Sequence, residues 1–298
     1  MQRHAQYDSS RSATSERTAH AALATFVAEH PGLFVLTGAG VSTDCGIPDY
    51  RDVRGDWKRP PPVDHQAFVS RLDVRRRYWA RSLVGFRALA SAQPGQAHRA
   101  LAALQRQGRI SCLVTQNVDG LHQRAGTRGV IDLHGQADMV KCMRCDATIM
   151  RHALHDELAR RNPEWVGLSA AVGPDGDADL EGYDFSRFSV PACQRCGTGV
   201  LKPDVVFFGD SVPRARVDAA FAALEAADAM LVVGSSLMVY SGYRFARYAA
   251  QTGKPIACVN LGRTRADDLY TLKVATSIGP TLGALADTLA GRLASAPE

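Results

Sequence analysis

The segment Leu33-Phe-Val-Leu-Thr-Gly-Ala-Gly-Val-Ser42 has the pattern of a buried strand that runs into a glycine-rich turn and then into the start of a helix. Glycines in such a turn let the backbone approach a pyrophosphate, whose charge the N-terminus of a helix stabilises. The dinucleotide fingerprint also expects a third glycine, where this chain has Thr43, and an acidic residue about 20 residues further on, where it has Pro60 to Pro62. The segment therefore predicts a phosphate-binding turn and disfavours an NAD-dependent dehydrogenase.

Similar apolar runs recur along the chain, and Ala-rich helical stretches separate them. We expect strands at 33–36, 110–114, 205–208, 230–233 and 256–259, and helices at about 20–29, 96–107, 214–227, 242–252 and 281–294. The runs show little polar alternation, which is typical of parallel strands covered on both faces. This alternation of strands and helices predicts an α/β fold with a doubly wound parallel sheet.

Two segments interrupt this alternation. Residues 53–95 contain a Pro-rich loop and then a helical stretch, and residues 135–200 contain a polar, Gly- and Asp-rich middle. We expect both to form a smaller lobe, helical in 53–95 and zinc-binding in 135–200, over a large lobe made of 20–52, 96–134 and 201–298. A ligand cleft is expected between the lobes, at the carboxyl ends of the strands. Residues 1–19 are polar and are expected to form a mobile tail before the domain at 20–298.

Four of the seven cysteines form two Cys-x-x-Cys pairs. They are Cys142, Cys145, Cys193 and Cys196, with 47 residues between the pairs. Two such turns can supply four thiolates to one Zn²⁺, and a site with four protein ligands is structural because it has no open position. Two disulfides or redox-active dithiols are the alternatives. An odd number of cysteines disfavours complete disulfide pairing and fits a reduced, cytosolic protein.

The composition excludes several classes of protein. The 298 residues are 46% hydrophobic and 22% charged, which is too apolar for a disordered chain. No apolar run approaches the ~20 residues that span a bilayer, and the N-terminus lacks the apolar core of a secretory signal. The net charge is +5, carried by 30 Arg and only 5 Lys, which leaves acidic ligands such as phosphates open.

Beyond the first turn, further motifs follow in one order along roughly residues 20–290. They are Gly38–Arg51 (GAGVSTDCGIPDYR), Thr115–His122 (TQNVDGLH), Leu133–Gly135, the two Cys-x-x-Cys pairs, Lys202–Gly209 (KPDVVFFG) and Val233–Ser236 (VGSS). With these motifs the chain closely resembles the sirtuins, and segments such as Pro174–Asp177 and Tyr240–Phe245 resemble the class II branch of that family. The resemblance implies a Rossmann-like large domain with a zinc-bearing smaller lobe.

The resemblance also assigns roles to individual residues. His134 would be the general base, and Asn117 would be a second catalytic residue. Val206, Phe208 and Gly209 would contact the acyl-lysine substrate. The residues implied for NAD binding are Gly38, Ala39, Gly40, Ser42, Thr43, Asp49, Tyr50, Arg51, Gln116, Asn117, Val118, Asp119, Gly234, Ser235, Ser236, Asn260, Leu261, Gly262 and Ile278.

The implied activity is that of an NAD-dependent protein lysine deacylase. It would use NAD as co-substrate and one structural Zn²⁺, release nicotinamide, and transfer the acyl group of an acyl-lysine protein to ADP-ribose. A protein mono-ADP-ribosyltransferase that uses the same NAD site is the alternative. A nucleic-acid-binding zinc module is disfavoured, because the Cys-x-x-Cys region has no dense basic-aromatic patch. We expect a cytoplasmic monomer without a specific nucleic-acid or membrane partner.

The acyl group itself is left open. Tyr78-Trp-Ala-Arg81 has the Tyr-x-x-Arg spacing of sirtuins that remove acidic acyl groups, and a Tyr hydroxyl with an Arg guanidinium could bind a carboxylate. The alternative is that Tyr78 packs inside the smaller lobe while Arg81 faces solvent, which we favour because aromatic residues at helical spacing are often core.

Overall fold

The computed structural model describes residues 17–59 and 62–294. Most of the tail expected at 1–19 lies outside this range, and residues 17–19 begin a helix that extends to residue 29. Within the described range, none of the helices has both the length and the apolar composition that crossing a bilayer requires.

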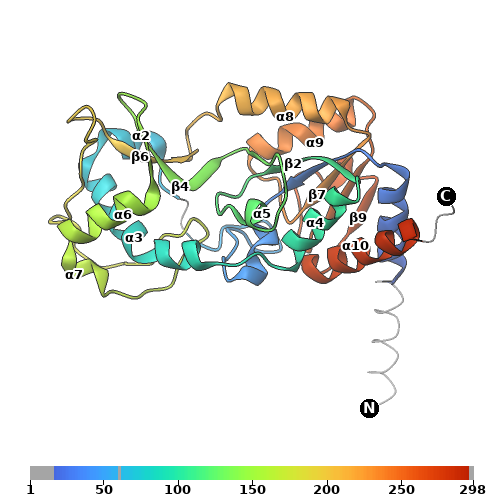
Figure 1. The fold of residues 1–298 in the computed structure, drawn as a ribbon, viewed down its shortest axis with the longest axis horizontal. Coiled ribbons are helices and arrows are strands. Elements are labelled where there is room, and N and C mark those ends of the chain that lie inside the picture. The colour runs from blue at the N-terminus through green and yellow to red at the C-terminus, as the bar shows by residue number, and fades with distance from the viewer. Residues whose placement is uncertain (1–16, 60–61, 295–298) are drawn as a thin grey trace, which may run out of the picture.

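A six-stranded sheet in the order β3-β2-β1-β7-β8-β9 forms the centre of the larger part (Figure 1). Each pair of neighbouring strands is parallel. The strands are β1 (Leu33–Thr37), β2 (Ile110–Thr115), β3 (Ile131–Asp132), β7 (Ala229–Val233), β8 (Ile256–Val259) and β9 (Leu272–Val274). The order reverses between β1 and β7, which is the position where doubly wound sheets bind ligands.

Helices cover both faces of this sheet because its strands are apolar on both sides. Along β1, Leu33 and Val35 belong to one apolar core, whereas Phe34 and Leu36 belong to the core on the opposite face. Figure 1 shows α8 (Arg214–Ala226) and α9 (Tyr240–Gln251) on one face, and α4 (Gln96–Arg106) and α10 (Ile278–Ala294) on the other. The expectation of a doubly wound α/β sheet is confirmed.

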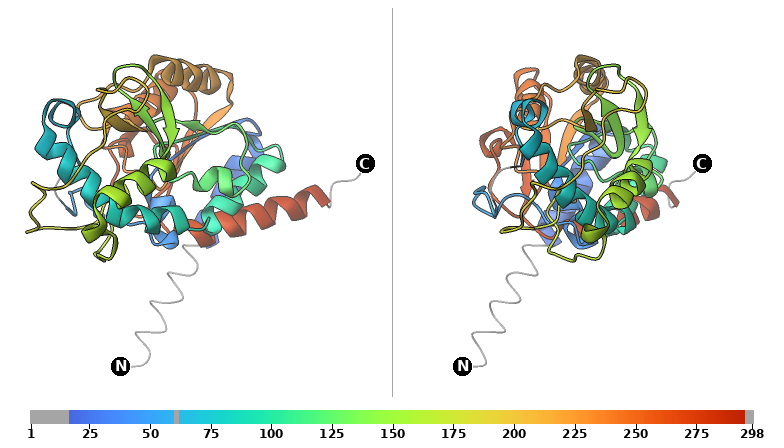
Figure 2. Two further views of the ribbon diagram at one scale, coloured as in Figure 1. Left: turned by 60° about the vertical axis from the view of Figure 1, so that its left-hand side comes forward. Right: turned by 90° about the vertical axis from the view of Figure 1, so that its left-hand side faces the viewer.

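A smaller lobe lies at the end of the molecule away from α10 (Figure 2). Its antiparallel sheet has the order β5-β4-β6. A separate apolar core joins this sheet to the neighbouring helices and contains Phe68, Trp79, Val140, Leu158 and Phe207. The elements are α2 (His65–Ser70), α3 (Leu72–Ser91), β4 (Gly135–Cys142), β5 (Thr148–Met150), α6 (Arg151–Arg161), α7 (Pro163–Val166) and β6 (Leu201–Val205).

The strand expected at 205–208 was wrong. The strand in this region, β6, ends at Val205 and pairs with β4 of the small sheet, although it lies in a segment expected to belong to the large lobe. The main-chain N–H of Val206 donates to the carbonyl oxygen of His134, and Phe207 packs into the core of the smaller lobe. The apolar run at 205–208 therefore packs with the smaller lobe and does not form a strand of the large sheet. The short strands β3 and β9 were not predicted.

Short helical turns connect the longer elements at the carboxyl edge of the parallel sheet. They are the 3₁₀ turns η1 (Ala39–Val41), η2 (Thr43–Cys45) and η3 (Asp267–Leu269), and the one-turn helix α5 (Leu121–Arg124). The glycine-rich segment after β1 therefore continues as two 3₁₀ turns.

The turns after β1 and β7 touch each other through their backbones. The N–H of Gly40 donates to the carbonyl oxygen of Gly234 at 2.9 Å, and the N–H of Gly38 donates to that of Val233 at 3.1 Å. A Cβ atom on Gly40 would lie 2.9 Å from the Cα and the carbonyl oxygen of Gly234. Gly234 itself has φ +60°, in the left-handed region that favours glycine. Side chains larger than hydrogen are excluded at this contact.

We therefore expect Gly40→Ala to lower the free energy of unfolding by about 1–3 kcal/mol, because the added methyl group meets backbone atoms that cannot move aside. Gly167→Ala is the matched control, since a Cβ at Gly167 meets no heavy atom within 4 Å and its φ is −86°. Urea unfolding of both variants measures the difference. Equal stability of Gly40→Ala and the wild type would contradict the close contact.

Candidate active site

A cavity of about 910 Å³ lies at the carboxyl edge of the parallel sheet and extends to the smaller lobe. This volume is near the upper end for small-molecule sites. Every residue with a predicted nucleotide-binding, catalytic or substrate role lines it. They come from the turns after β1, β2, β3, β7 and β8, from the segment after β6 and from the start of α10. The four cysteines are not among its lining residues.

A buried polar network joins the turn after β1 to the turn after β2. The hydroxyl of Ser42 donates to the carboxylate of Asp119 at 2.7 Å. The side-chain amide of Asn117 donates to the Ser42 hydroxyl at 3.1 Å and to the carbonyl oxygen of Gly38 at 3.2 Å. Ser42 is only 1% exposed, so these hydrogen bonds fix the two turns relative to each other.

His134 lies between β3 and β4, and both of its ring nitrogens have partners. Nδ1 is 2.9 Å from the carbonyl oxygen of Gln116, which can only accept, so Nδ1 carries the proton. Nε2 is then the unprotonated atom, and it lies 2.8 Å from the hydroxyl of Ser241. Burial is the main cause that lowers the pKa of His134 to about 4. The imidazole is therefore neutral at pH 7 and has a basic nitrogen.

The same Gln116 also connects the turn after β2 to the turn after β7. Its side-chain amide donates to the hydroxyl of Ser235 at 2.7 Å and to the carbonyl oxygen of Thr37 at 3.2 Å. Ser235 is 6% exposed, and its hydroxyl also accepts from the main-chain N–H of Leu237. Gln116 thus links β1, β2 and β7 beneath the cavity.

A loop between residues 49 and 58 covers one side of the cavity. The guanidinium of Arg51 lies 3.9 Å from the centre of the Trp57 ring and donates to the carbonyl oxygen of Gly55 at 2.8 Å. Asp49 forms an ion pair with Lys58. The loop is therefore ordered by its own side chains, and its polar groups face a cavity able to take a charged ligand.

The side chains of Phe208 and Trp57 form an aromatic wall that lines part of the cavity. The ring of Phe208, which is 36% exposed, lies 5.6 Å from the ring of Trp57. Gly209 has φ +76°, and a Cβ there would lie 2.6 Å from a carboxylate oxygen of Asp64. The segment Val206–Gly209 thus places apolar surface toward the interior of the cavity.

The turn after β8 lines a further part of the cavity. The side-chain amide of Asn260 donates to the carbonyl oxygen of Gly262 at 3.0 Å, and Leu261 is 59% exposed. The N–H of Arg263 donates to the carbonyl oxygen of Val53 at 2.8 Å. This turn and the 49–58 loop therefore meet at the rim of the cavity.

Several lining residues were not among the predicted site residues. Ser241 and Arg244 come from α9, and Arg151 comes from α6. Arg151 is 2% exposed, and its guanidinium lies 4.3 Å from the centre of the Phe86 ring. The segment Tyr240–Phe245, which contains Ser241 and Arg244, was noted only for its resemblance to the class II branch, and nothing in the sequence assigned a site role to any of the three residues.

The structure separates Tyr78 from Arg81. Tyr78 is 9% exposed, lines the cavity and packs on Phe68 and Phe207. Arg81 is not a lining residue, and its Nε donates to the carbonyl oxygen of Ala178 at 2.8 Å. The packing role expected for Tyr78 is confirmed, whereas Arg81 is half-buried and bonded to a loop instead of facing solvent.

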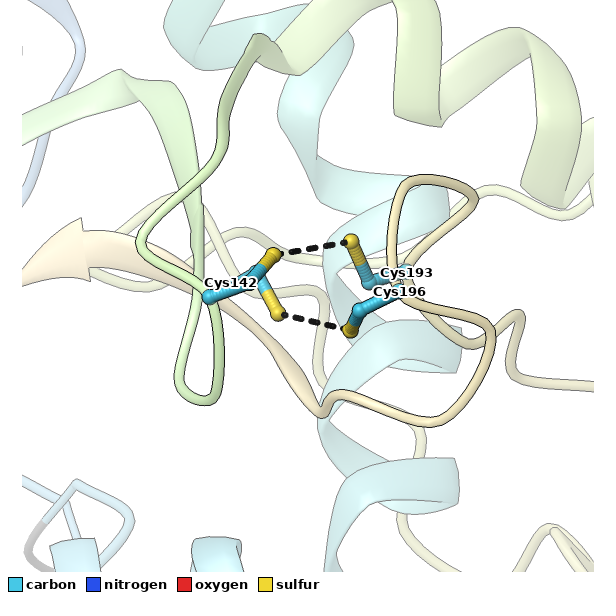
Figure 3. A group of neighbouring side chains, drawn as sticks. Cys142, Cys193 and Cys196 are labelled. Carbon is cyan, nitrogen blue, oxygen red and sulfur yellow. Dashed lines mark hydrogen bonds between the residues drawn. The ribbon is translucent and has the colours of Figure 1, made fainter.

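The two Cys-x-x-Cys turns meet in the smaller lobe (Figure 3). The Sγ atoms of Cys142 and Cys196 are 3.8 Å apart, as are those of Cys145 and Cys193, and all four lie within 4.8 Å of one another. A disulfide would need about 2.05 Å. Four thiolates at about 2.3 Å from one Zn²⁺ have tetrahedral edges of about 3.8 Å. The donor set and spacing therefore fit one structural zinc ion.

Comparisons with known proteins agree with this arrangement. The model of the Sir2 family matches residues 38–241. A protein of Bradyrhizobium diazoefficiens named NAD-dependent protein deacetylase 2 is 62% identical over 256 residues, which are 86% of this chain and 93% of that protein. An NAD-dependent protein deacetylase of Bordetella bronchiseptica is 61% identical over 253 residues, or 85% and 92% of the two chains.

Solved structures show the same fold. A mutant Sir2 homologue in complex with ADP-ribose has a TM-score of 0.73 and 29% identity, covering 93% of this chain and 98% of that one. A Sir2 homologue in complex with NAD has a TM-score of 0.70 and 29% identity, covering 91% and 94%. The family model matches more than half of the sequence, and the chain belongs to the Sir2 family.

Proposed function

We propose that this chain is an NAD-dependent protein lysine deacylase. It releases nicotinamide from NAD and transfers the acyl group of an acyl-lysine side chain to ADP-ribose. The observation that carries the proposal is the position of His134, a neutral imidazole with a basic Nε2, in the same cavity as the glycine-rich turn after β1. A phosphate-binding turn and a general base in one cavity are what this reaction needs.

The relatives and neighbours support this reaction. The most similar relatives named here are called NAD-dependent protein deacetylases, and a Sir2 structure containing a p53 peptide and NAD covers 91% of this chain at 28% identity. These names favour deacylation of a protein over transfer of ADP-ribose to one.

NAD supplies a ribose carbon from which nicotinamide leaves as a neutral molecule, so that even a weak nucleophile such as an amide oxygen can bond to that carbon. The backbone of Gly38–Ser42 and the hydroxyls of Ser235 and Ser236 would hold the phosphates. Asn117 and Asp119, fixed by Ser42, would hold the nicotinamide side of the molecule. Asn260, Leu261, Gly262 and Ile278 would hold the adenosine side.

Two further tasks belong to this chain's own residues. The apolar surface of Val206 and Phe208 would exclude water from the acyl-lysine, which protects a reactive ribose from hydrolysis. His134 would then accept a proton on Nε2, because Nδ1 is already protonated and bonded to Gln116. The lowered pKa keeps the imidazole neutral and available at pH 7.

The zinc ion would act at a distance from this chemistry. All four coordination positions would be filled by cysteines, so no water could bind to the metal and be activated. The ion would hold the end of β4 against the segment before β6.

The assignment to the class II branch, a cytoplasmic location and a monomeric state belong to the same proposal. The branch assignment rests on the sequence motifs around Pro174 and Tyr240, and the location rests on cysteines that are free of disulfides.

We expect His134→Ala to lower formation of deacylated peptide and acyl-ADP-ribose by about 10²- to 10⁴-fold, because the general base is lost. Mass spectrometry of the protein with NAD and acetyl-, succinyl-, glutaryl-, lipoyl- and long-chain acyl-lysine peptides measures both products. His152→Ala, at an exposed position on α6, is the control.

If a folded His134→Ala variant turned over substrate at the wild-type rate, His134 would not be the general base. Nicotinamide release with mass added to a protein, and no deacylated peptide from the wild type, would favour ADP-ribosyl transfer over deacylation.

Zinc removal is expected to unfold the smaller lobe and thereby abolish activity. Structural zinc contributes on the order of 10 kcal/mol to folding in small zinc domains. Cys196→Ser should lose bound zinc by elemental analysis and melt at a lower temperature, whereas Cys112→Ser, on β2, should retain it. Full activity in a preparation shown to be free of zinc would contradict a structural ion.

Arg81→Met should leave the ratio of succinyl-lysine to acetyl-lysine turnover almost unchanged, because Arg81 is bonded to Ala178 and does not line the cavity. Its expected effect is a loss of stability of about 1 kcal/mol from the missing hydrogen bond. A selective loss of succinyl- or glutaryl-peptide turnover would show that Arg81 reaches the acyl group.

A further inference from the structure

We infer that Ser241 is a positioning residue for His134, whose hydroxyl holds Nε2 of the imidazole in both protonation states of the ring. The inference rests on the proposed role of His134 as the base. Ser241 lies in the first turn of α9, is 8% exposed and lines the cavity. Its hydroxyl is 2.8 Å from Nε2, and the two residues are 107 positions apart in the sequence.

The ring is held from both sides. On one side the carbonyl oxygen of Gln116 accepts from Nδ1–H, which fixes the tautomer. On the other side the Ser241 hydroxyl donates to Nε2 while the ring is neutral. A ring bonded at both nitrogens cannot flip without breaking two hydrogen bonds in a buried site, so its plane and its basic atom are fixed.

Gln116 and Ser241, the two hydrogen-bond partners of the His134 ring, belong to segments that pack against each other. The residue after Ser241 is Gly242, where a Cβ would lie only 2.4 Å from the side-chain oxygen of Gln116. The start of α9 is therefore packed directly against Gln116, the residue that holds Nδ1. The distance between the two partners of the imidazole depends on this close packing.

A hydroxyl suits Nε2 because it can reverse its role. Nε2 has one lone pair, so the hydroxyl hydrogen of Ser241 must first turn away from it, by rotation about the Cβ–Oγ bond, before Nε2 can take a proton. The new N–H then needs an acceptor, and the oxygen of the rotated hydroxyl accepts from it. The charged groups that act on the ring are cationic: Arg244 on α9 and Arg216 on α8, which both lower the pKa of His134. An arginine side chain has only donors, so neither of these two residues could accept the hydrogen bond of a protonated Nε2. The N-terminus of α9 also disfavours positive charge.

Loss of the hydroxyl should therefore affect the proton transfer and leave substrate binding intact. We expect Ser241→Ala to lower kcat about 10- to 100-fold, since a buried N–H of the charged ring loses its acceptor. The KM values for NAD and peptide should change little. Exchange of labelled nicotinamide into NAD, which needs no general base, should persist. Ser241→Thr, which keeps a hydroxyl, should restore most of the activity.

A measurement on the free protein tests the hydrogen bond without catalysis. Long-range ¹H–¹⁵N NMR of histidine-labelled protein should show His134 with Nδ1 protonated in the wild type. In Ser241→Ala the Nε2 resonance should shift. The pKa of His134 should fall further, because both forms of the ring lose a hydrogen bond and the bond lost by the charged form is the stronger one. Ser111→Ala is the control. Ser111 lies near the amino end of β2, away from the cavity at the carboxyl ends of the strands, and its hydroxyl donates to the carbonyl oxygen of Leu33.

Unchanged Nε2 resonance, pKa and kcat in a folded Ser241→Ala variant would overturn the inference. An equal loss of nicotinamide exchange and of deacylation would also overturn it, because the serine would then serve NAD binding or the fold. If Ser241→Ala does not fold, Ser241→Cys, a weaker hydrogen-bonding group of similar size, answers the same question. Absence of deacylase activity in the wild type would refute the proposed function. The NMR measurement would still show whether Ser241 is hydrogen-bonded to Nε2 of His134.

Discussion

The backbone contact between the turns after β1 and β7 is the constraint on which the floor of the cavity depends. Three glycines, Gly38, Gly40 and Gly234, let the two turns approach to hydrogen-bonding distance. This contact lies where the strand order reverses, so main-chain atoms form the bottom of the site. A floor made of backbone can approach phosphates closely, and it leaves side chains from the neighbouring turns to select the rest of the ligand.

Side chains from the neighbouring strand ends are fixed on this floor by mutual hydrogen bonds. Ser42 holds Asn117 and Asp119, and Gln116 holds both Ser235 and the ring of His134. Few of these groups depend on solvent for a partner, so the site is ordered before any ligand enters. Preorganised polar groups of this kind need little rearrangement during a reaction, which is the main source of electrostatic catalysis.

The sequence was most informative where one residue pattern has one structural meaning. The apolar runs around β1, β7 and β8 predicted buried parallel strands, and the two Cys-x-x-Cys pairs predicted a metal cluster. The run 205–208 was wrongly predicted to be a buried strand. Its apolar residues have other roles, because Phe207 packs in the core of the smaller lobe and Phe208 lines the cavity. The partner of His134 could not be read from the sequence, because Ser241 lies 107 positions away on a helix that only the fold brings near.

The smaller lobe is tied to the chemistry by two adjacent residues with different surroundings. Phe207 is 8% exposed and packs on Phe68 in the core that also contains Cys142 and Cys193. Phe208 is 36% exposed and lies against Trp57 in the cavity. Since neighbouring residues in one segment move together, the cysteine cluster supports the position of the aromatic wall. A structural metal would thus act on the proposed acyl-lysine side of the site through packing, without contacting a reacting atom.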